Sequence, residues 1–248
     1  MKVTYENLIN NHTLNVFTDA SILRDNIING YNLSISTPGA QIYLGDILQD
    51  SLIQMLPDCT NNEGEIIAIQ NGLYLAEKWR KLLPQVDNIN LFSDSKISLL
   101  GLREWCYSWI KAEQNGILYG SSGEIKNQVH FIHAIYFILS HDLKINMYHT
   151  RGHINAVNFR SVAKFRNSFV KENHLNYYPD DHIINFMIKG NNKIDNDTRQ
   201  YLNFNKIYID DWVKPRPRNG ELIINWHNLI KSFDMIKYQY LTGGYNKI

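Results

Sequence analysis

The sequence predicts an α/β fold, in which β-strands alternate with helices along the chain. Two β-prone runs, residues 14–18 and 88–92, are each followed further along the chain by a pattern typical of a helix. Apolar residues make up 44% of the 248 residues and aromatic residues 12%, a composition that can bury a hydrophobic core and differs from that of disordered chains. At this length we expect one large domain, or one domain with a modest extension.

The first β-structure is expected at residues 14–18, which read LNVFT and run directly into Asp19. Residues 31–44 supply more β-branched and aromatic residues around Pro38 and Gly39, which predicts a further strand or a hairpin. The chain therefore begins with β-structure that has a carboxylate at the end of its first strand.

The first helix is expected over residues 65–83. Apolar residues from Ile66 to Ala76 recur there at steps of three and four, which places them on one face of a helix. Thr60 and Glu63 precede this stretch in the pattern T-x-x-E, which is typical of a helix capping box.

The alternation continues with a strand at residues 88–92, which read NINLF and run into Asp94. The elements expected after it are a helix over 97–112, a glycine-rich loop at 116–123, a helix over 125–139, a strand at 144–148, a basic helical piece and a loop within 155–189, a helix over 192–202, a linker at 214–217 and an amphipathic segment over 222–240.

Charge and cysteine content limit the possible function classes. Lys and Arg (25) nearly balance Asp and Glu (24), so the net charge of +1 does not indicate a protein that binds polyanions through its overall charge. Cys59 and Cys106 cannot by themselves form a disulfide framework or a four-ligand zinc site, and they favour a reduced, intracellular protein. We therefore expect a cytoplasmic location.

The sequence also predicts no export and no membrane insertion. The N-terminal MKVTYENLINN carries Glu6 where a signal peptide needs an uninterrupted apolar stretch. The longest apolar run, residues 131–139, is broken by His133 and is about half as long as the ~20 residues that a spanning helix requires.

Three acidic residues stand where a carboxylate can carry chemistry: Asp19 and Asp94 at the ends of β-prone runs, and Glu65 at a helix start. If the two strands are neighbours, the three carboxylates converge and repel one another unless cations bind. Oxygen ligands of this kind suit Mg²⁺ or Mn²⁺, and two such ions can catalyse phosphodiester hydrolysis by water. Each residue taken alone also has a structural interpretation, because Asp is common in turns after strands and Glu is favoured in the first turn of a helix.

Five short motifs around these acids resemble the type 1 ribonucleases H, in the same order along the chain. They are TDAS at residues 18–21, TNNEGE at 60–65, SDS at 93–95, GH at 152–153 and GNNKID at 190–195. The TNNEGE and GNNKID matches are the more specific ones, and the ordered set is stronger than any single motif. The resemblance covers about residues 14–203.

The resemblance implies a ribonuclease H-like α/β fold, with a mixed five-stranded sheet flanked by helices and a helical insertion before the last catalytic helix. It implies a domain over 1–205, with the insertion at about 155–189, and leaves 206–248 as a C-terminal extension with an amphipathic helix. The implied activity is endonucleolytic hydrolysis of the RNA strand of RNA–DNA hybrids with two Mg²⁺ ions, for which Mn²⁺ is a possible substitute. The implied metal ligands are Asp19, Glu65, Asp94 and Asp195.

Further roles are carried over from the same motifs. His153 corresponds to a loop histidine that moves protons or releases product, and its unperturbed pKa of about 6.5 suits that role; His149 is its rival, as Asp197 is the rival of Asp195. The expected substrate-binding residues are Thr60, Asn61, Asn62, Ser95 and Asn191. Side-chain amides such as those of Asn61 and Asn62 can recognise ribose 2′-hydroxyls, while Thr60 can also serve simply as a helix cap.

The chain departs from the family pattern in several places. About 36 residues separate His153 from Gly190, where the family has only a few, and the basic residues of this insertion either contact nucleic acid or form a solvated helix. Residues 22–25 lack the short polar groups expected near a ribose, and the aromatic stretch 105–126 is either a nucleic-acid handle or core. Two other functions therefore stay open: a DNA-acting nuclease of the same fold, and a non-catalytic nucleic-acid-binding module. The expected partner is an RNA–DNA hybrid, and the sequence does not indicate which proteins, if any, bind the chain.

Overall fold

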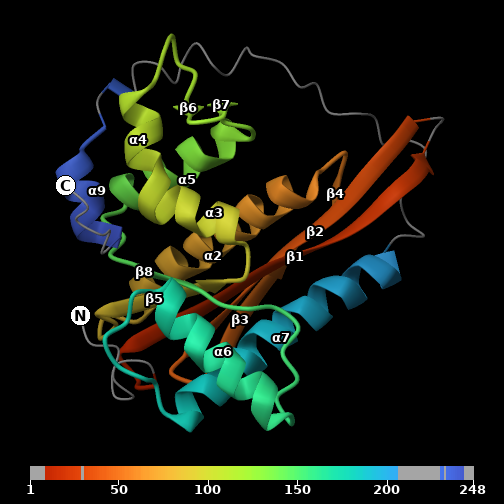
Figure 1. The fold of residues 1–248 in the computed structure, drawn as a ribbon, viewed down its shortest axis with the longest axis vertical. Helices are drawn as coiled ribbons and strands as arrows, with labels where there is room; N and C mark the ends of the chain where they lie inside the picture. The colour runs from red at the N-terminus through yellow and green to blue at the C-terminus, as the bar shows by residue number, and fades with distance from the viewer. Residues whose placement is uncertain (1–8, 29–30, 206–229, 232, 243–248) are drawn as a thin grey trace.

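The computed structural model describes residues 9–28, 31–205, 230–231 and 233–242 (Figure 1). Its centre is a mixed sheet flanked by helices, which confirms the predicted fold class, and the strand order along this sheet is β3-β2-β1-β5-β8. The strands are β1 (Thr13–Ile28), β2 (Tyr31–Leu44), β3 (Ile47–Ile53), β5 (Asn88–Ser93) and β8 (Asn146–His149). β2 pairs antiparallel with both β1 and β3, whereas β5 runs parallel to β1 and β8 runs parallel to β5.

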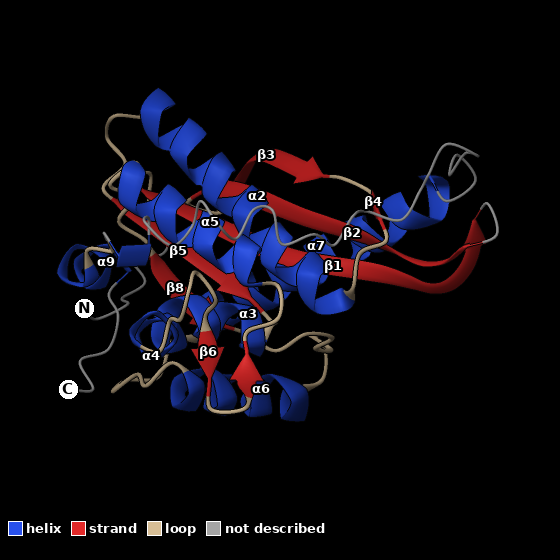
Figure 2. Ribbon diagram, turned by 90° about the horizontal axis from the view of Figure 1, so that it is seen from above, coloured by secondary structure: helices blue, strands red, loops and turns tan. Residues whose placement is uncertain are grey.

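The N-terminal hairpin is longer than the sequence predicts. β1 extends well past Asp19 because it pairs with β2 along most of its length, and Figures 1 and 2 show this hairpin projecting from the sheet. β3 and the short β4 (Leu56–Pro57), which both pair with β2, have no counterpart among the predicted elements. β3 lies at the sheet edge and is only partly buried, so its sequence lacks a clear apolar alternation.

Helices follow the strands largely where they are expected. They are α2 (Asn61–Leu82), α3 (Lys96–Leu100), a π-helical turn η1 (Gly101–Trp105), α4 (Cys106–Lys111), α5 (Gln128–Ser140), α6 (Phe159–Glu172), α7 (Asp181–Asn205) and α9 (Met235–Thr242). The capping box is confirmed, since the Thr60 hydroxyl accepts from the Glu63 amide and the Glu63 carboxylate accepts from the Thr60 amide. The expected loop at 116–123 contains most of a small hairpin of β6 (Tyr119–Gly120) and β7 (Gly123–Glu124).

Helices cover both faces of the sheet. Successive strand residues point to opposite faces, and Val16 belongs to a hydrophobic cluster with α2 and α5, whereas Phe17 belongs to one with α6 and α7. Two separate apolar layers therefore fix the sheet between the helices. None of the helices in the described ranges combines the length and apolar character that a membrane crossing requires.

The start of α7 corrects one prediction. Residues 190–195 were expected to begin a helix near 192, but they lie inside α7, which begins at Asp181. Asp180 ends the preceding loop, because its carboxylate accepts from the amide of Ile183 and its carbonyl from that of Ile184. Gly190 lies where α7 crosses β1, and a side chain there would collide with the ring of Phe17. The glycine thus permits a close helix–sheet contact and does not mark a helix end.

The last described helix packs on the same core as the sheet. Tyr238 and Leu241 of α9 are buried in the cluster that includes α5, and the Tyr238 hydroxyl donates to the carbonyl of Leu102 at 3.1 Å. The Ile145 amide donates to the carbonyl of Leu241 at 2.6 Å. The expected linker at 214–217 and much of the expected segment 222–240 lie outside the described residues, and the domain boundary near 205 stays a prediction.

Candidate active site

Three carboxylates from separate parts of the chain meet at the centre of the sheet. Thr18 of β1 pairs in parallel register with Ser93 of β5, so the residues that follow them, Asp19 and Asp94, are brought side by side. Glu65, the fifth residue of α2, reaches the same place from the covering helix. One ligand oxygen from each of these three carboxylates lies within 4.8 Å of the other two.

This cluster has the properties of a site for a hard divalent cation. Asp19 and Glu65 are only 6% and 7% exposed, and Glu65 Oε2 is buried with no hydrogen-bond partner among the described residues. An unpaired, buried carboxylate oxygen is costly unless a cation or proton compensates it. The ligands are all oxygen atoms, which suits Mg²⁺ or Mn²⁺ and not the softer metals.

Electrostatics in the cluster strongly disfavour three simultaneous negative charges. Burial, followed by the nearby carboxylates of Asp94 and Asp195, raises the pKa of Asp19 from 3.8 to about 8. Burial and then the charge of Asp19 raise the pKa of Glu65 well above its ordinary value. Burial also raises the pKa of Asp94, although the nearby Asn191 side chain lowers it. Bound cations would reverse these shifts, because they stabilise the charged carboxylates.

The fourth predicted ligand, Asp195, lies next to the cluster but outside the group of three. Its partner His153 follows Gly152, which lies against Asp94, and the charge of Asp195 is among the causes that raise the pKa of the three clustered carboxylates. Its own oxygens accept from Arg199 at 2.8 and 3.0 Å, and Oδ2 lies 3.3 Å from Nδ1 of His153. Asp195 is therefore the link between the carboxylate cluster and two positively charged or titratable side chains.

The rival for this position points elsewhere. Asp197 accepts from Lys193 at 2.8 Å and from Gln41 at 2.5 Å. Because residues two apart on a helix lie on different faces, the carboxylates of Asp195 and Asp197 cannot serve the same site.

His153 lies in the loop after β8, next to the glycine that contacts Asp94. Its side chain is 72% exposed, and its backbone has a left-handed φ of +55°. The loop is tied to α7, since Asn192 donates to the carbonyl of Ile154 at 2.8 Å. Gly152, the residue before His153, lies against the carboxylate of Asp94, and a Cβ atom there would collide with Oδ2.

His149, the rival histidine, is held by structural contacts. It is 7% exposed, its Nδ1 pairs with Glu172, and its Nε2 lies 3.1 Å from the carbonyl oxygen of Asp94. Both ring nitrogens are engaged, so His149 is held against the end of β5.

The predicted substrate-binding residues lie on or beside the elements that carry Glu65, Asp94 and Asp195. Asn61 and Asn62 lie four and three residues before Glu65 in α2, which places them on the side of the helix nearest that carboxylate. Thr60 is the exposed cap of α2. Ser95 follows Asp94, and its hydroxyl donates to that of Ser98 at 2.9 Å. Asn191 is buried and accepts from the Thr150 hydroxyl at 2.9 Å.

Some residues at the site were not singled out from the sequence. Arg199 is one of them, and its guanidinium forms an ion pair with Asp195. The spacing of four residues on one helix is a sequence pattern that predicts such a pair. Thr150 also lies at the site, because its hydroxyl donates to the Asn191 side chain. This contact joins residues that are distant in the sequence, so no sequence pattern indicates it. In the aromatic stretch 105–126, Trp109 is buried and contacts Phe131, which confirms a core role for that residue.

A family model described as RNase H matches residues 11–164 of this chain. The match includes Asp19, Glu65, Asp94 and His153, and ends before Asp195. No curated protein sequence matches the chain.

Several solved structures are similar in fold at low sequence identity. LC11-RNase H1 in complex with an RNA/DNA hybrid is 14% identical with a TM-score of 0.41, and the match covers 64% of this chain and 97% of that one. The RNase H domain of prototype foamy virus, PFV, is 13% identical with a TM-score of 0.43, over 67% and 96% of the two chains. The foamy viral protease–reverse transcriptase with an RNA/DNA hybrid is 12% identical with a TM-score of 0.45, over 66% of this chain but only 20% of that chain.

Proposed function

Because this chain belongs to the RNase H family and is a ribonuclease H enzyme, we propose that it hydrolyses the RNA strand of RNA–DNA hybrids as an endonuclease that uses two divalent metal ions. The observation that carries the proposal is the convergence of Asp19, Glu65 and Asp94 within 4.8 Å, with the charge of Asp195 beside them. Two similar structures contain RNA/DNA hybrids, which makes a hybrid the first substrate to test.

The metal ligands in this proposal are the four acidic residues. Asp19, Glu65 and Asp94 would hold Mg²⁺ directly, with Asp195 completing the site, and Mn²⁺ would substitute. Divalent ions held in this way promote attack of water on a phosphodiester and stabilise the leaving oxygen. The protein's part is to keep the carboxylates converged before substrate binds: β1 and β5 fix two of them and α2 fixes the third.

His153 would handle a proton at the open side of the site. Asp195 holds its Nδ1 at 3.3 Å, so the other ring nitrogen is left to exchange a proton with the leaving group or with solvent. The exposed position of the ring allows it to move with its loop during product release.

The start of α2 would distinguish RNA from DNA. Asn61 and Asn62 present amides on the helix turn that leads to Glu65, and an amide can both donate to and accept from a ribose 2′-hydroxyl. Thr60 would contact the DNA strand while it caps the helix, and Ser95 and Asn191 would line the site near Asp94. The free cysteines Cys59 and Cys106 support a reducing, cytoplasmic location.

The direct test incubates the purified protein with Mg²⁺ or Mn²⁺ and labelled RNA–DNA hybrid, double-stranded RNA or duplex DNA. We expect cleavage of the RNA strand of the hybrid alone, and its loss in Asp94→Asn. Asp87→Asn is a matched control, because Asp87 is exposed and lies in the loop before β5. Cleavage of duplex DNA would instead favour a DNA-acting nuclease, and binding without cleavage would favour a non-catalytic module.

A further inference from the structure

The helix α6, between the His153 loop and α7, carries a basic stripe on its outer face. Its exposed residues Arg160, Lys164, Asn167 and Lys171 recur at steps of four, three and four residues. This spacing places them along one side of the helix. Among the described residues, no carboxylate forms an ion pair with Arg160, Lys164 or Lys171.

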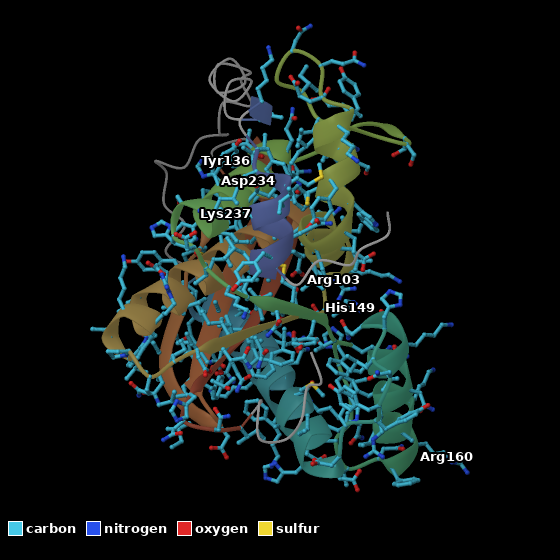
Figure 3. The ribbon with its side chains drawn as sticks, turned by 90° about the vertical axis from the view of Figure 1, so that its left-hand side faces the viewer. Arg103, Tyr136, His149, Arg160, Asp234 and Lys237 are labelled. Atoms are coloured by element: carbon cyan, nitrogen blue, oxygen red, sulfur yellow. The ribbon has the colours of Figure 1, made fainter. Side chains whose placement is uncertain are left out.

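The opposite face of α6 fixes the direction in which this stripe points. Phe165 and Phe169 are buried in the hydrophobic cluster that also contains Tyr148 and α7. Arg166, on the flank of the helix, pairs with Asp181 at the start of α7. The helix therefore cannot turn its basic residues inward, and Figure 3 shows Arg160 extending from α6 away from the body of the protein.

Buried polar contacts connect the C-terminal end of α6 to the active site. Arg103, 3% exposed, donates to Asn173 at 2.8 Å and to the carbonyl of Glu172 at 3.1 Å. Asn173 in turn bonds both the amide and the carbonyl of His149 at 2.8 and 2.7 Å. Figure 3 shows Arg103 and His149 close together near this end of the helix. His149 also contacts the carbonyl of Asp94, so the position of α6 is fixed relative to the carboxylate cluster.

A further basic residue, Lys96, follows the carboxylate cluster closely in the sequence. Burial raises the pKa of Glu172, but a hydrogen bond from Ser168 and the charges of His149 and Lys96 lower it overall. Lys96 is exposed and comes two residues after Asp94, so it brings positive charge from the active site to the end of α6 where Lys171 lies. Arg160 and Lys171 are eleven residues apart, which corresponds to about 16 Å along the helix, or about five steps of a duplex that rises 3.4 Å per phosphate.

We propose that this α6 stripe, formed by Arg160, Lys164, Asn167 and Lys171, binds the phosphate backbone of the nucleic-acid duplex outside the active site. The inference rests on the proposed function, since it concerns the same substrate. The partner is assigned by charge: a helix face with three cations that form no ion pair with any described carboxylate complements a regular polyanion. An asparagine in the middle of the stripe adds a hydrogen-bond donor for a phosphate oxygen.

The test compares two triple variants with the same loss of charge. Arg160→Gln with Lys164→Gln and Lys171→Gln removes the stripe, and Lys78→Gln with Lys81→Gln and Lys144→Gln removes three lysines distant from α6. Binding of a fluorescently labelled RNA–DNA hybrid is measured in EDTA over a series of salt concentrations, for the full chain in each case. Circular dichroism checks that both variants are folded.

We expect the stripe variant to bind the hybrid at least tenfold more weakly at low salt. Each lost phosphate contact should reduce the slope of log affinity against log salt by about 0.7–0.9, so the total reduction should approach 2–3. The control should keep the wild-type slope, and Arg160→Lys with Lys164→Arg and Lys171→Arg should restore it. Equal slopes for stripe variant and control would overturn the proposal.

Cleavage assays on the same proteins separate this inference from the proposed function. If the wild type binds nucleic acid through the stripe but cuts no hybrid, the stripe is upheld and the proposed activity fails. If the wild type cuts the hybrid and the stripe variant keeps the wild-type salt slope, the activity is upheld and the stripe fails. Stripe-dependent binding to phosphatidylserine vesicles, with no effect on nucleic acid, would also overturn the inference.

Discussion

Asp19 and Asp94 each lie one residue beyond Thr18 and Ser93, the last paired residues of the two parallel central strands. The register of β1 and β5 therefore determines how close the two carboxylates are. A shift of one residue would turn one of them to the opposite face of the sheet. The site consequently depends on the hydrophobic pattern that sets this register, in particular on Val16, Phe17 and Phe92.

Neutralising Glu65 should stabilise the protein without metal. In EDTA, Glu65→Gln is expected to raise the free energy of unfolding by roughly 1–2 kcal/mol, because burial and the nearby acids disfavour the charged form of Glu65 on folding and an amide has no such cost. The same variant should lose most of the increase in Tm that Mg²⁺ gives the wild type. Thermal unfolding with and without Mg²⁺ measures both effects. Glu124→Gln, at an exposed position in β7, is the control. A lower Tm for Glu65→Gln than for the wild type in EDTA would show that the Glu65 carboxyl group does not destabilise the metal-free protein.

Stability of the metal-free protein should fall as pH rises from about 4 to about 8. Folded Asp19 keeps its proton up to a pKa of about 8, whereas the unfolded chain releases it near 3.8. Between these values the folded state binds more protons, so the free energy of unfolding decreases with increasing pH. Chemical denaturation in EDTA at several pH values tests this, and Asp19→Asn should flatten the profile. An unchanged profile in Asp19→Asn would assign the titration to another group.

The two candidates for the fourth acid should differ sharply. Asp195→Asn is expected to lower hybrid cleavage by on the order of 10–100-fold, because it removes charge beside the cluster and the partner of His153. Asp197→Asn should stay within about threefold of the wild type, because its carboxylate contacts Lys193 and Gln41 instead. Initial rates at saturating Mg²⁺ compare the two. Reversed results would assign the site to Asp197.

Gly152→Ala should impair the site while leaving the fold intact. The added methyl group would collide with Oδ2 of Asp94 and displace that carboxylate. A displacement of about 1 Å can cost on the order of 10²-fold in rate, so we expect a large loss of cleavage and a higher Mg²⁺ requirement. A Mg²⁺ titration of the cleavage rate measures both effects. The control is Ser121→Ala, in the exposed β6–β7 turn. Wild-type activity would mean that the loop moves aside when substrate binds.

Much of the site could be predicted from the sequence because its parts follow local rules. A β-prone run that ends in an acid places that acid at a strand end, and a capping box locates the start of the helix that carries Glu65. These signals need no knowledge of distant contacts. They explain why the convergence of Asp19, Glu65 and Asp94 agrees with the sequence-based expectation.

The remaining features depend on tertiary contacts. β3 forms because β2 offers it an edge, and its half-exposed residues have no periodic pattern. α7 begins well before Gly190 because Asp180 caps it and because the glycine permits contact with Phe17, although glycine usually suggests a helix end. The choice between His149 and His153 required the contacts of Glu172 and Asp195, which are distant from them in sequence.

The most direct test of the central claim is anomalous diffraction from crystals of the protein grown with Mn²⁺. We predict anomalous density bounded by the carboxylate oxygens of Asp19, Glu65 and Asp94, with loss of that density in Glu65→Gln crystals. Density elsewhere on the protein, or none at a Mn²⁺ concentration that supports cleavage, would contradict the assignment of this cluster as the metal site.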